Sequence, residues 1–259
     1  MRFSRPDNGI GEPQMTEITD AWVKAVELPE PGNMMETHEN REHVFVRQGT
    51  NMARTIHEAI ETYTGKPITD QRILDFGCGV GRVAMPLYHF FRKPDVCVDV
   101  DPKAIRYLRP QIPDVACRVT KFDPPLPFRD RAFDVVFSVS IWTHLNAESA
   151  EAWLTEITRI LRPGGYAFLT TSSYTMLQLR RSHFVTANLG WDKVTDDMLR
   201  EQGFIFLETP SAPGTGTYGL ASHDPEYIRR EWSRHMDVVD ILPGAILGGQ
   251  DMNVLRKRA

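Results

Sequence analysis

Hydrophobic residues follow two different periods along the middle of the chain. Apolar runs of strand length occur at residues 73–76, 95–100, 115–120, 133–139 and 166–171. Between these runs, apolar residues recur every three or four positions, most regularly from Ala150 to Leu161, which is typical of one face of a helix. The alternation predicts an α/β fold with a doubly wound, mostly parallel sheet.

Two further helices are predicted before the first strand. The first covers residues 18–26 and ends at Pro29, and the second begins with Thr50 as its N-cap and ends before Gly65. Two interpretations of these helices stay open. They either cover the mouth of a ligand site or pad one face of the sheet.

The pattern becomes irregular after the fifth strand, and we interpret residues 172–222 as an insert. Asp224 followed by Pro225 then predicts the start of a helix. Residues 238–242 and 252–256 predict two closing strands. The chain is thus divided into an extension, a core, an insert and a closing part, at 1–70, 71–171, 172–222 and 223–259.

The strongest local signal is Arg-Ile-Leu-Asp-Phe-Gly-Cys-Gly-Val-Gly-Arg at residues 72–82. A strand there ends in three alternate glycines, Gly77, Gly79 and Gly81, and a helix follows. Glycine lets the backbone pass close beneath a ligand. Asp75 is placed to accept hydrogen bonds from the N–H groups of the loop and to face a cationic ligand group. The loop therefore predicts a ligand with an amine and a sulfonium rather than a pyrophosphate.

A dinucleotide fingerprint requires glycine where this chain has Arg82, which argues against an NAD-dependent oxidoreductase. The spacing Asp-x-Gly-x-Gly-x-Gly instead resembles the first motif of the class I S-adenosylmethionine (SAM) dependent methyltransferases. Phe-Asp-Val-Val-Phe-Ser at 133–138 and Leu-Arg-Pro-Gly-Gly at 161–165 resemble the second half of the same core, so the resemblance covers residues 72–171. It implies a Rossmann-like sheet of seven strands with an antiparallel last strand, and SAM as the cofactor.

The resemblance also assigns roles to two acidic positions after the glycine loop. Asp99 aligns with the acid that binds the ribose diol, while Asp101 before Pro102 has the pattern of a helix N-cap. Asp123 matches the acid that contacts the adenine amino group, although Pro124 lacks the N–H that the family uses next. The residues expected to bind the cofactor are Asp75, Gly77, Cys78, Gly79, Gly81, Arg82, Asp99, Val100, Asp123 and Ser138.

His144 is the candidate for catalysis. Methyl transfer to a hydroxyl requires removal of a proton, and His144 follows the fourth strand at the carboxyl edge, where ligands of open α/β sheets bind. The alternative is a structural histidine that caps the next helix or packs on Trp142. The residues expected to contact the methyl acceptor are Trp142, Tyr174, His183 and Tyr218. The insert that carries most of them either forms the acceptor pocket or is a hairpin packed outside the sheet.

The tail strengthens the resemblance to bacterial methyltransferases of glycan and secondary-metabolite pathways. It carries Tyr-Gly at 218–219, His-x-Pro-x-Tyr at 223–227 and Gln-Asp at 250–251. This resemblance implies a small-molecule acceptor, with a hydroxyl of a sugar or secondary metabolite as the group that is methylated. A non-catalytic SAM-binding partner subunit is the alternative function.

Composition limits the domain organisation and the kinds of partner that the protein is expected to have. At 259 residues with 41% hydrophobic content, the chain is expected to be one domain with extensions, as a monomer or homodimer. The net charge of −4, with both signs interspersed, argues against a nucleic acid partner, and Leu126 stands where the Asp-Pro-Pro-Tyr motif of amino-methyltransferases needs an aromatic residue.

Three cysteines are an odd number and are expected to be reduced in a cytoplasmic protein. No apolar run predicts a membrane span, and the histidines lack the spacing of metal ligands.

Overall fold

A computed structural model describes residues 43–91, 94–183, 186, 189–209 and 218–259. The helix predicted at residues 18–26 lies outside these ranges. No helix among the described residues combines the length and the apolar character that crossing a membrane requires.

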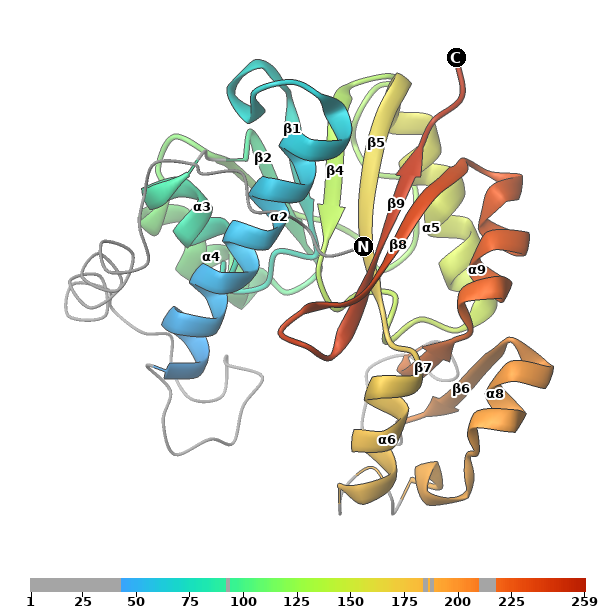
Figure 1. Cartoon of the computed structure of the whole chain (residues 1–259). Coiled ribbons are helices and arrows are strands. Elements are labelled where there is room, and N and C mark those ends of the chain that lie inside the picture. Colours follow the sequence, from blue (N-terminus) through green and yellow to red (C-terminus); the bar gives the residue numbers. More distant parts are fainter. Residues whose placement is uncertain (1–42, 92–93, 184–185, 187–188, 210–217) are drawn as a thin grey trace.

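The centre of the fold is a sheet of seven strands in the order β3-β2-β1-β4-β5-β9-β8 (Figure 1). Its strands are β1 Ile73–Phe76, β2 Val96–Asp99, β3 Ala116–Val119, β4 Phe133–Ser138, β5 Leu161–Thr171, β8 Asp237–Ile246 and β9 Gln250–Arg256. Strand β9 runs antiparallel to both β5 and β8, while the pairs among β1 to β5 are parallel. The predicted fold class, including the antiparallel last strand, is confirmed.

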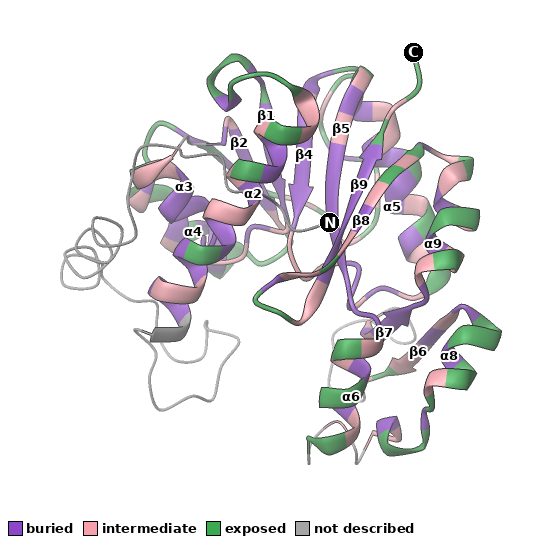
Figure 2. Cartoon of the chain, in the orientation of Figure 1, coloured by how far each residue is buried: buried purple, intermediate pink, exposed green. Residues whose placement is uncertain are grey.

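Helices cover both faces of the sheet. The described helices of the core are α2 Gly49–Thr64, α3 Ala84–Phe90, α4 Pro102–Gln111, α5 Ala147–Ile160 and α9 Pro225–Glu231. Ile73 of β1 packs with Ile56 of α2, whereas its neighbour Leu74 packs with Trp153 of α5. Because successive strand residues point to opposite faces, the central strands are buried on both sides (Figure 2).

The insert forms a small layer of its own below the carboxyl ends of β4 and β5 (Figure 1). It contains α6 Tyr174–Ser182, α8 Asp196–Gln202, β6 Phe204–Glu208 and β7 Gly219–His223. Strands β6 and β7 pair antiparallel in a separate two-stranded sheet. A hydrophobic cluster holds the layer together, and its buried members are Leu177, Trp191, Val194, Leu199 and Ile205.

Short helical turns complete the described elements. They are the π-helix His43–Gln48 and the 3₁₀ turns Ile68–Asp70, Trp191–Lys193 and Trp232–Arg234. The prediction of Thr50 as an N-cap is wrong, because α2 continues directly from the π-helix and the Thr50 hydroxyl donates to the carbonyl of Val46 at 2.8 Å. Pro86 lies in the first turn of α3, where its missing N–H has no partner to lose.

Candidate active site

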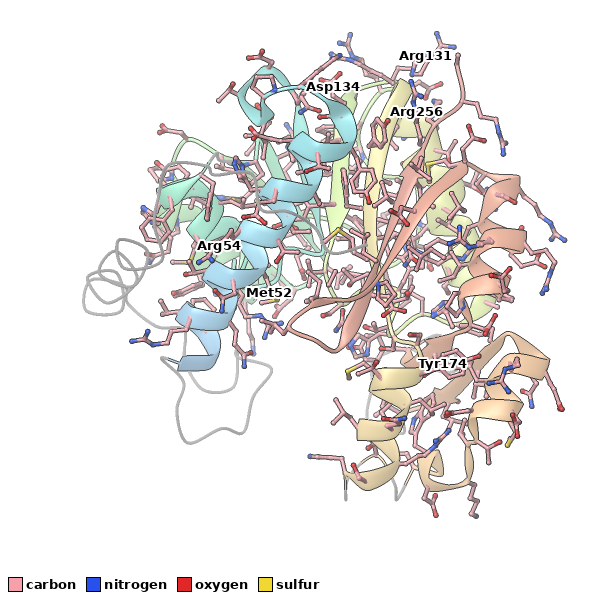
Figure 3. The ribbon with its side chains drawn as sticks, viewed as in Figure 1. Met52, Arg54, Arg131, Asp134, Tyr174 and Arg256 are labelled. Atoms are coloured by element: carbon pink, nitrogen blue, oxygen red, sulfur yellow. The ribbon has the colours of Figure 1, made fainter. Side chains whose placement is uncertain are left out.

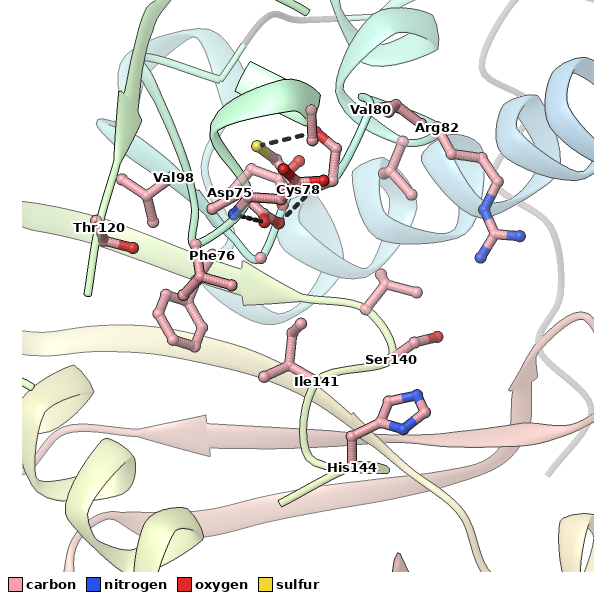
Figure 4. A pocket seen from close by; sticks show the side chains of 18 of the residues that line it. Asp75, Phe76, Cys78, Val80, Arg82, Val98, Thr120, Ser140, Ile141 and His144 are labelled. Atoms are coloured by element: carbon pink, nitrogen blue, oxygen red, sulfur yellow. Dashed lines mark hydrogen bonds between the residues drawn. The ribbon is translucent and has the colours of Figure 1, made fainter. Parts of the chain in front are cut away.

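A cavity of about 410 Å³ opens at the carboxyl ends of β1, β2 and β4. Figure 4 shows the glycine loop after β1 on one side of it and the loop after β4, with Ile141 and His144, on the other. The topology explains this position. The connection after β2 runs to β3 on one side of β1, and the connection after β4 runs to β5 on the other side, so the two diverge and leave a crevice.

The glycine loop forms the floor of the cavity. The N–H groups of Gly77 and Cys78 both donate to the carbonyl of Val98, at 2.9 and 3.0 Å, which ties the loop to β2. Gly79 has a φ of +53°, and a Cβ built there meets no heavy atom within 4 Å. Since Gly79 lines the cavity, a side chain at this position would occupy ligand space.

Asp99 joins the loop to the end of β2. Its Oδ2 accepts the N–H of Gly79 at 2.7 Å, and its Oδ1 accepts the N–H of Asp101 at 2.8 Å. Asp101 in turn caps α4 by accepting the N–H of Lys103. An ionised carboxylate offers about four acceptor sites, so Asp99 keeps capacity for a ligand diol.

Asp75 does not accept hydrogen bonds from the loop as expected, because the loop N–H groups donate to Val98 and Asp99 instead. Its side chain is buried, and Oδ2 has no partner among the described residues. Burial, together with the nearby Asp99 carboxylate, raises the pKa of Asp75 well above its ordinary value. An orphaned carboxylate oxygen in the wall of a cavity fits a ligand that brings a donor, such as the ammonium group of SAM.

The opposite wall begins with a sharp turn at Ser140. This residue has a φ of +65°, and its N–H donates to the hydroxyl of Thr170 at 2.8 Å. After the turn, Ile141 and His144 line the cavity, whereas Trp142 enters the core with none of its surface exposed. Trp142, which was expected to bind the acceptor, packs in the core between the rings of Phe76 and Trp232 and does not line the cavity.

His144 is held in one tautomer by strand β7. Its Nδ1 lies 2.9 Å from the carbonyl oxygen of Gly219. A carbonyl can only accept, so Nδ1 carries the proton and Nε2 keeps its lone pair. Burial lowers the pKa of His144. The hydrogen bond to Gly219 opposes this effect in part, and the charge of Arg180 makes a smaller contribution that lowers the pKa further. The imidazole is therefore neutral at pH 7 and has the form that a general base requires.

Tyr218 covers His144 from the insert side. The two rings are stacked, with 4.9 Å between centroids and 1° between planes, and Tyr218 also lines the cavity. Tyr174 and His183 do not line it. Tyr174, labelled in Figure 3 at the start of α6, donates to Asp224 at the cap of α9, and His183 is exposed at the end of α6.

Three expected cofactor residues lie off the cavity wall. A Cβ on Gly81 would lie 2.3 Å from Cδ1 of Leu108, so this glycine allows close packing on α4. Ser138 is buried in β4 and its hydroxyl donates to the carbonyl of Phe76. Asp123 is exposed. The other expected cofactor residues line the cavity, and they are Asp75, Gly77, Cys78, Gly79, Arg82, Asp99 and Val100.

The sequence interpretation missed several cavity residues. Thr120 and Phe122 line the wall where Asp123 was expected, and their place just after β3, at the carboxyl edge of the sheet, was a usable signal. Phe45 reaches the cavity from the π-helix, and no local motif marks it.

The three cysteines lie close together in the core, and Cys78 also lines the cavity. Cys78, Cys97 and Cys117 are buried free thiols, and Cys97 and Cys117 are register partners in β2 and β3. Within the described ranges, no three His, Cys, Asp or Glu side chains form a group that could hold a metal ion.

The sheet order, the glycine loop and the two carboxylates have the arrangement of the class I SAM-dependent methyltransferase fold. Residues 74–169 match the family model described as a methyltransferase domain. The cofactor of the class is SAM, and the orphaned Asp75 oxygen and the open space over Gly79 fit it.

Curated relatives with different acceptors share part of the sequence. The chain is 24% identical over 136 residues to tRNA N(3)-cytidine methyltransferase METTL2 of Gallus gallus, covering 48% of this chain and 36% of that protein. It is 33% identical over 105 residues to the fatty-acid O-methyltransferase of Mycolicibacterium smegmatis, covering 40% of this chain and 38% of that protein. The chain therefore spans well under half the length of either relative.

A solved structure matches nearly the whole chain. The 1,6-didemethyltoxoflavin-N1-methyltransferase of Burkholderia thailandensis, with bound 1,6-didemethyltoxoflavin and S-adenosylhomocysteine, aligns with a TM-score of 0.53 and 15% identity. The match covers 98% of this chain and 94% of that one. At this identity the likeness establishes the fold.

Proposed function

We propose that the protein transfers a methyl group from SAM to a hydroxyl of a small molecule, with a sugar or secondary metabolite as the acceptor class. The observation that carries the proposal is the position of His144. It lies across the cavity from the glycine loop, neutral, with Nδ1 bonded to Gly219 and Nε2 left as a proton acceptor.

The cofactor half of the cavity offers groups that suit each part of SAM. Bound SAM supplies an electrophilic methyl group on a sulfonium, and the neutral thioether that leaves needs no acid. Asp75 would pair with the ammonium group, Asp99 would accept the ribose diol, and Gly79 would lie against the ligand without a side chain between them.

His144 would remove the proton of the acceptor hydroxyl through Nε2. The charge that develops on the imidazole is stabilised by the Gly219 carbonyl, to which Nδ1–H donates at 2.9 Å. The pKa of His144 is lowered by burial, so the base is in its active form at neutral pH. General base catalysis of this kind contributes roughly 10²- to 10⁴-fold to the rate.

The walls near His144 favour an acceptor with an apolar body. Ile141, Leu145 and Val139 line this part of the cavity, and Tyr218 contributes an aromatic ring with a hydroxyl. Such a combination is typical of small-molecule sites. The net charge of −4 also does not favour a polyanion such as tRNA, although several of the curated relatives are tRNA methyltransferases.

Two measurements test the proposal. Thermal shifts with SAM, S-adenosylhomocysteine and NAD should show stabilisation by the first two only. Transfer of a labelled methyl group should then be measured with sugars, phenols, carboxylates, amines and tRNA. Turnover of hydroxyl compounds alone is the expected result. Methylation of tRNA would replace the small-molecule proposal, and SAM binding without any turnover would favour the non-catalytic partner subunit.

A further inference from the structure

Arg180 of α6 is buried in the insert without a carboxylate partner among the described ion pairs. Its side chain is 5% exposed. One nitrogen, Nη1, donates to the carbonyl of Ala221 at 2.7 Å and to the hydroxyl of Ser222 at 2.9 Å. The other, Nη2, donates to the hydroxyl of Ser172 at 3.0 Å. Every hydrogen-bond partner of Arg180 among the described residues is thus a neutral oxygen at the junction of β5 and β7.

The guanidinium remains charged in this environment. Its carbon lies 4.6 Å from the centre of the Trp191 ring, a geometry that stabilises a cation. Burial lowers the pKa of Arg180 to about 10, which still leaves it protonated at pH 7. A buried charge satisfied only by neutral groups is costly for stability, and a buried polar network of this kind fixes one arrangement of the chain around it.

The arrangement that Arg180 fixes includes the backbone around His144. Ala221, whose carbonyl accepts from Arg180, donates its own N–H to the carbonyl of Thr143 at 2.8 Å. Gly219 donates its N–H to the carbonyl of His144 at 3.0 Å and accepts from the Nδ1 of the same residue. Strand β7 is therefore paired with β6 on one side and with residues 143–145 on the other.

We propose that Arg180 is a positioning residue that clamps strand β7 against the loop after β4 and so fixes the orientation and tautomer of His144. The inference rests on the proposed function, since it matters for catalysis only if His144 is the base. On this account the insert determines the state of the catalytic histidine as well as contributing Tyr218 to the cavity wall.

The charge of Arg180 acts on His144 in a second way. It disfavours the imidazolium, which adds to the effect of burial on the pKa of His144. The ring that faces His144 from the insert is Tyr218, and burial followed by the Asp99 carboxylate raises the pKa of that phenol, so it is neutral at pH 7. Loss of the Arg180 charge should therefore move the pKa of His144 upward.

The test compares Arg180→Met and Arg180→Lys with Arg181→Met in the full chain. Arg181 is the matched control, because it lies next on α6 and donates to Val194 and Asp196, both within the insert. We expect Arg180→Met to lower kcat by about tenfold to a hundredfold, as a small displacement of a catalytic group does, with affinity for S-adenosylhomocysteine retained. Arg180→Lys should keep the acid limb of the pH profile while still losing kcat, and Arg181→Met should keep both.

Nitrogen-15 NMR of the His144 side chain gives a readout that does not need the acceptor. The native protein should show the Nδ1–H tautomer, and Arg180→Met should show a mixture of tautomers with a raised pKa. An unchanged tautomer and pKa in a folded Arg180→Met protein, or an equal loss of kcat in Arg181→Met, would overturn the proposal.

Two further comparisons distinguish a failure of Arg180→Met to fold from a failure of His144 as the base. If Arg180→Met does not fold, Ser172→Ala and Ser222→Ala each remove one contact and should change the tautomer ratio in the same direction, and no change in either would overturn the clamp. If His144→Ala leaves turnover intact, the proposed base fails, yet the NMR result for Arg180→Met still decides whether Arg180 positions the ring.

Discussion

The N–H of Gly79 donates to Oδ2 of Asp99 over 2.7 Å, so the floor of the cofactor cavity and the acid at the end of β2 are one hydrogen-bonded unit. The other oxygen of Asp99 holds the N–H of Asp101, which begins α4. Asp99 therefore shapes the loop in addition to lining the cavity. Substitution of Asp99 should affect cofactor binding through both contacts.

Asp99→Ala is expected to weaken SAM at least tenfold. Charge-assisted hydrogen bonds contribute roughly 1.5 to 3 kcal/mol each, and about 1.4 kcal/mol corresponds to a factor of ten in affinity. Asp101→Ala is the control, because Asp101 caps α4, and its loss should cost about 1 kcal/mol of stability with SAM affinity largely kept. Calorimetry measures the affinities. Equal weakening by Asp101→Ala and none by Asp99→Ala would reverse the assignment.

Gly79→Val should abolish SAM binding by placing a side chain in the cavity. The control is Gly65→Val, because Gly65 caps α2 with a φ of +63° and, as at Gly79, a Cβ there meets no heavy atom within 4 Å. Both variants carry the same backbone strain, on the order of 1 to 2 kcal/mol, but Gly65 lies off the cavity wall. We expect the two variants to lose similar amounts of stability. Only Gly79→Val should lose affinity for SAM. Native affinity in Gly79→Val would place the cofactor elsewhere.

The periodicity of the core was sufficient to predict the sheet. Strands such as β4 are apolar at nearly every position because both faces are covered, and this pattern depends on local sequence. The elements of the insert were harder to predict from the sequence. Helix α6 was not predicted, because few of its residues are buried, which leaves little apolar periodicity. Strand β7 was also missed, since its pairing with β6 and residues 143–145 depends on distant parts of the chain.

The candidate site also combines residues that a local motif predicts with residues whose position depends on distant parts of the chain. The glycine loop and Asp99 carry their roles in a local motif, so the sequence located them on the cavity wall. Trp142 and His144 are two residues apart and looked equally suited to a ligand. Only the turn at Ser140 and the pairing of His144 with Gly219 decide which of them faces the cavity.

His144→Ala should lower turnover by about two to four orders of magnitude, with SAM affinity retained, because the base lies across the cavity from the cofactor loop. The pKa of His144 lies below its ordinary 6.5, so activity should be constant near neutral pH and decline as the pH falls through that lowered value. His183→Ala is the control, since His183 is exposed at the end of α6 and should leave the rate unchanged. Steady-state kinetics across pH measure both effects. Unchanged turnover in His144→Ala would make this histidine structural.

His223 of β7 should make the fold less stable in acid. The side chain is buried, and neither ring nitrogen has a partner among the described residues. Burial, with the charge of Arg180, lowers the pKa of His223 from 6.5 to about 3. Above pH 6.5 the ring is neutral in both the folded and the unfolded chain, so His223 does not change the free energy of unfolding with pH. Between 6.5 and about 3 the unfolded chain binds a proton that the folded chain rejects.

As the pH falls from 6.5 to about 3, His223 alone should therefore lower the free energy of unfolding by about 1.4 kcal/mol for each pH unit. Other groups titrate in the same range, and Asp75, whose pKa is raised, acts in the opposite direction. The comparison with His223→Leu isolates the effect, since leucine fills a similar volume without a titrating group. Urea unfolding at a series of pH values should show a shallower decline for His223→Leu, while His183→Leu should follow the native protein. Parallel curves for native protein and His223→Leu would show that the ring is protonated in the folded state.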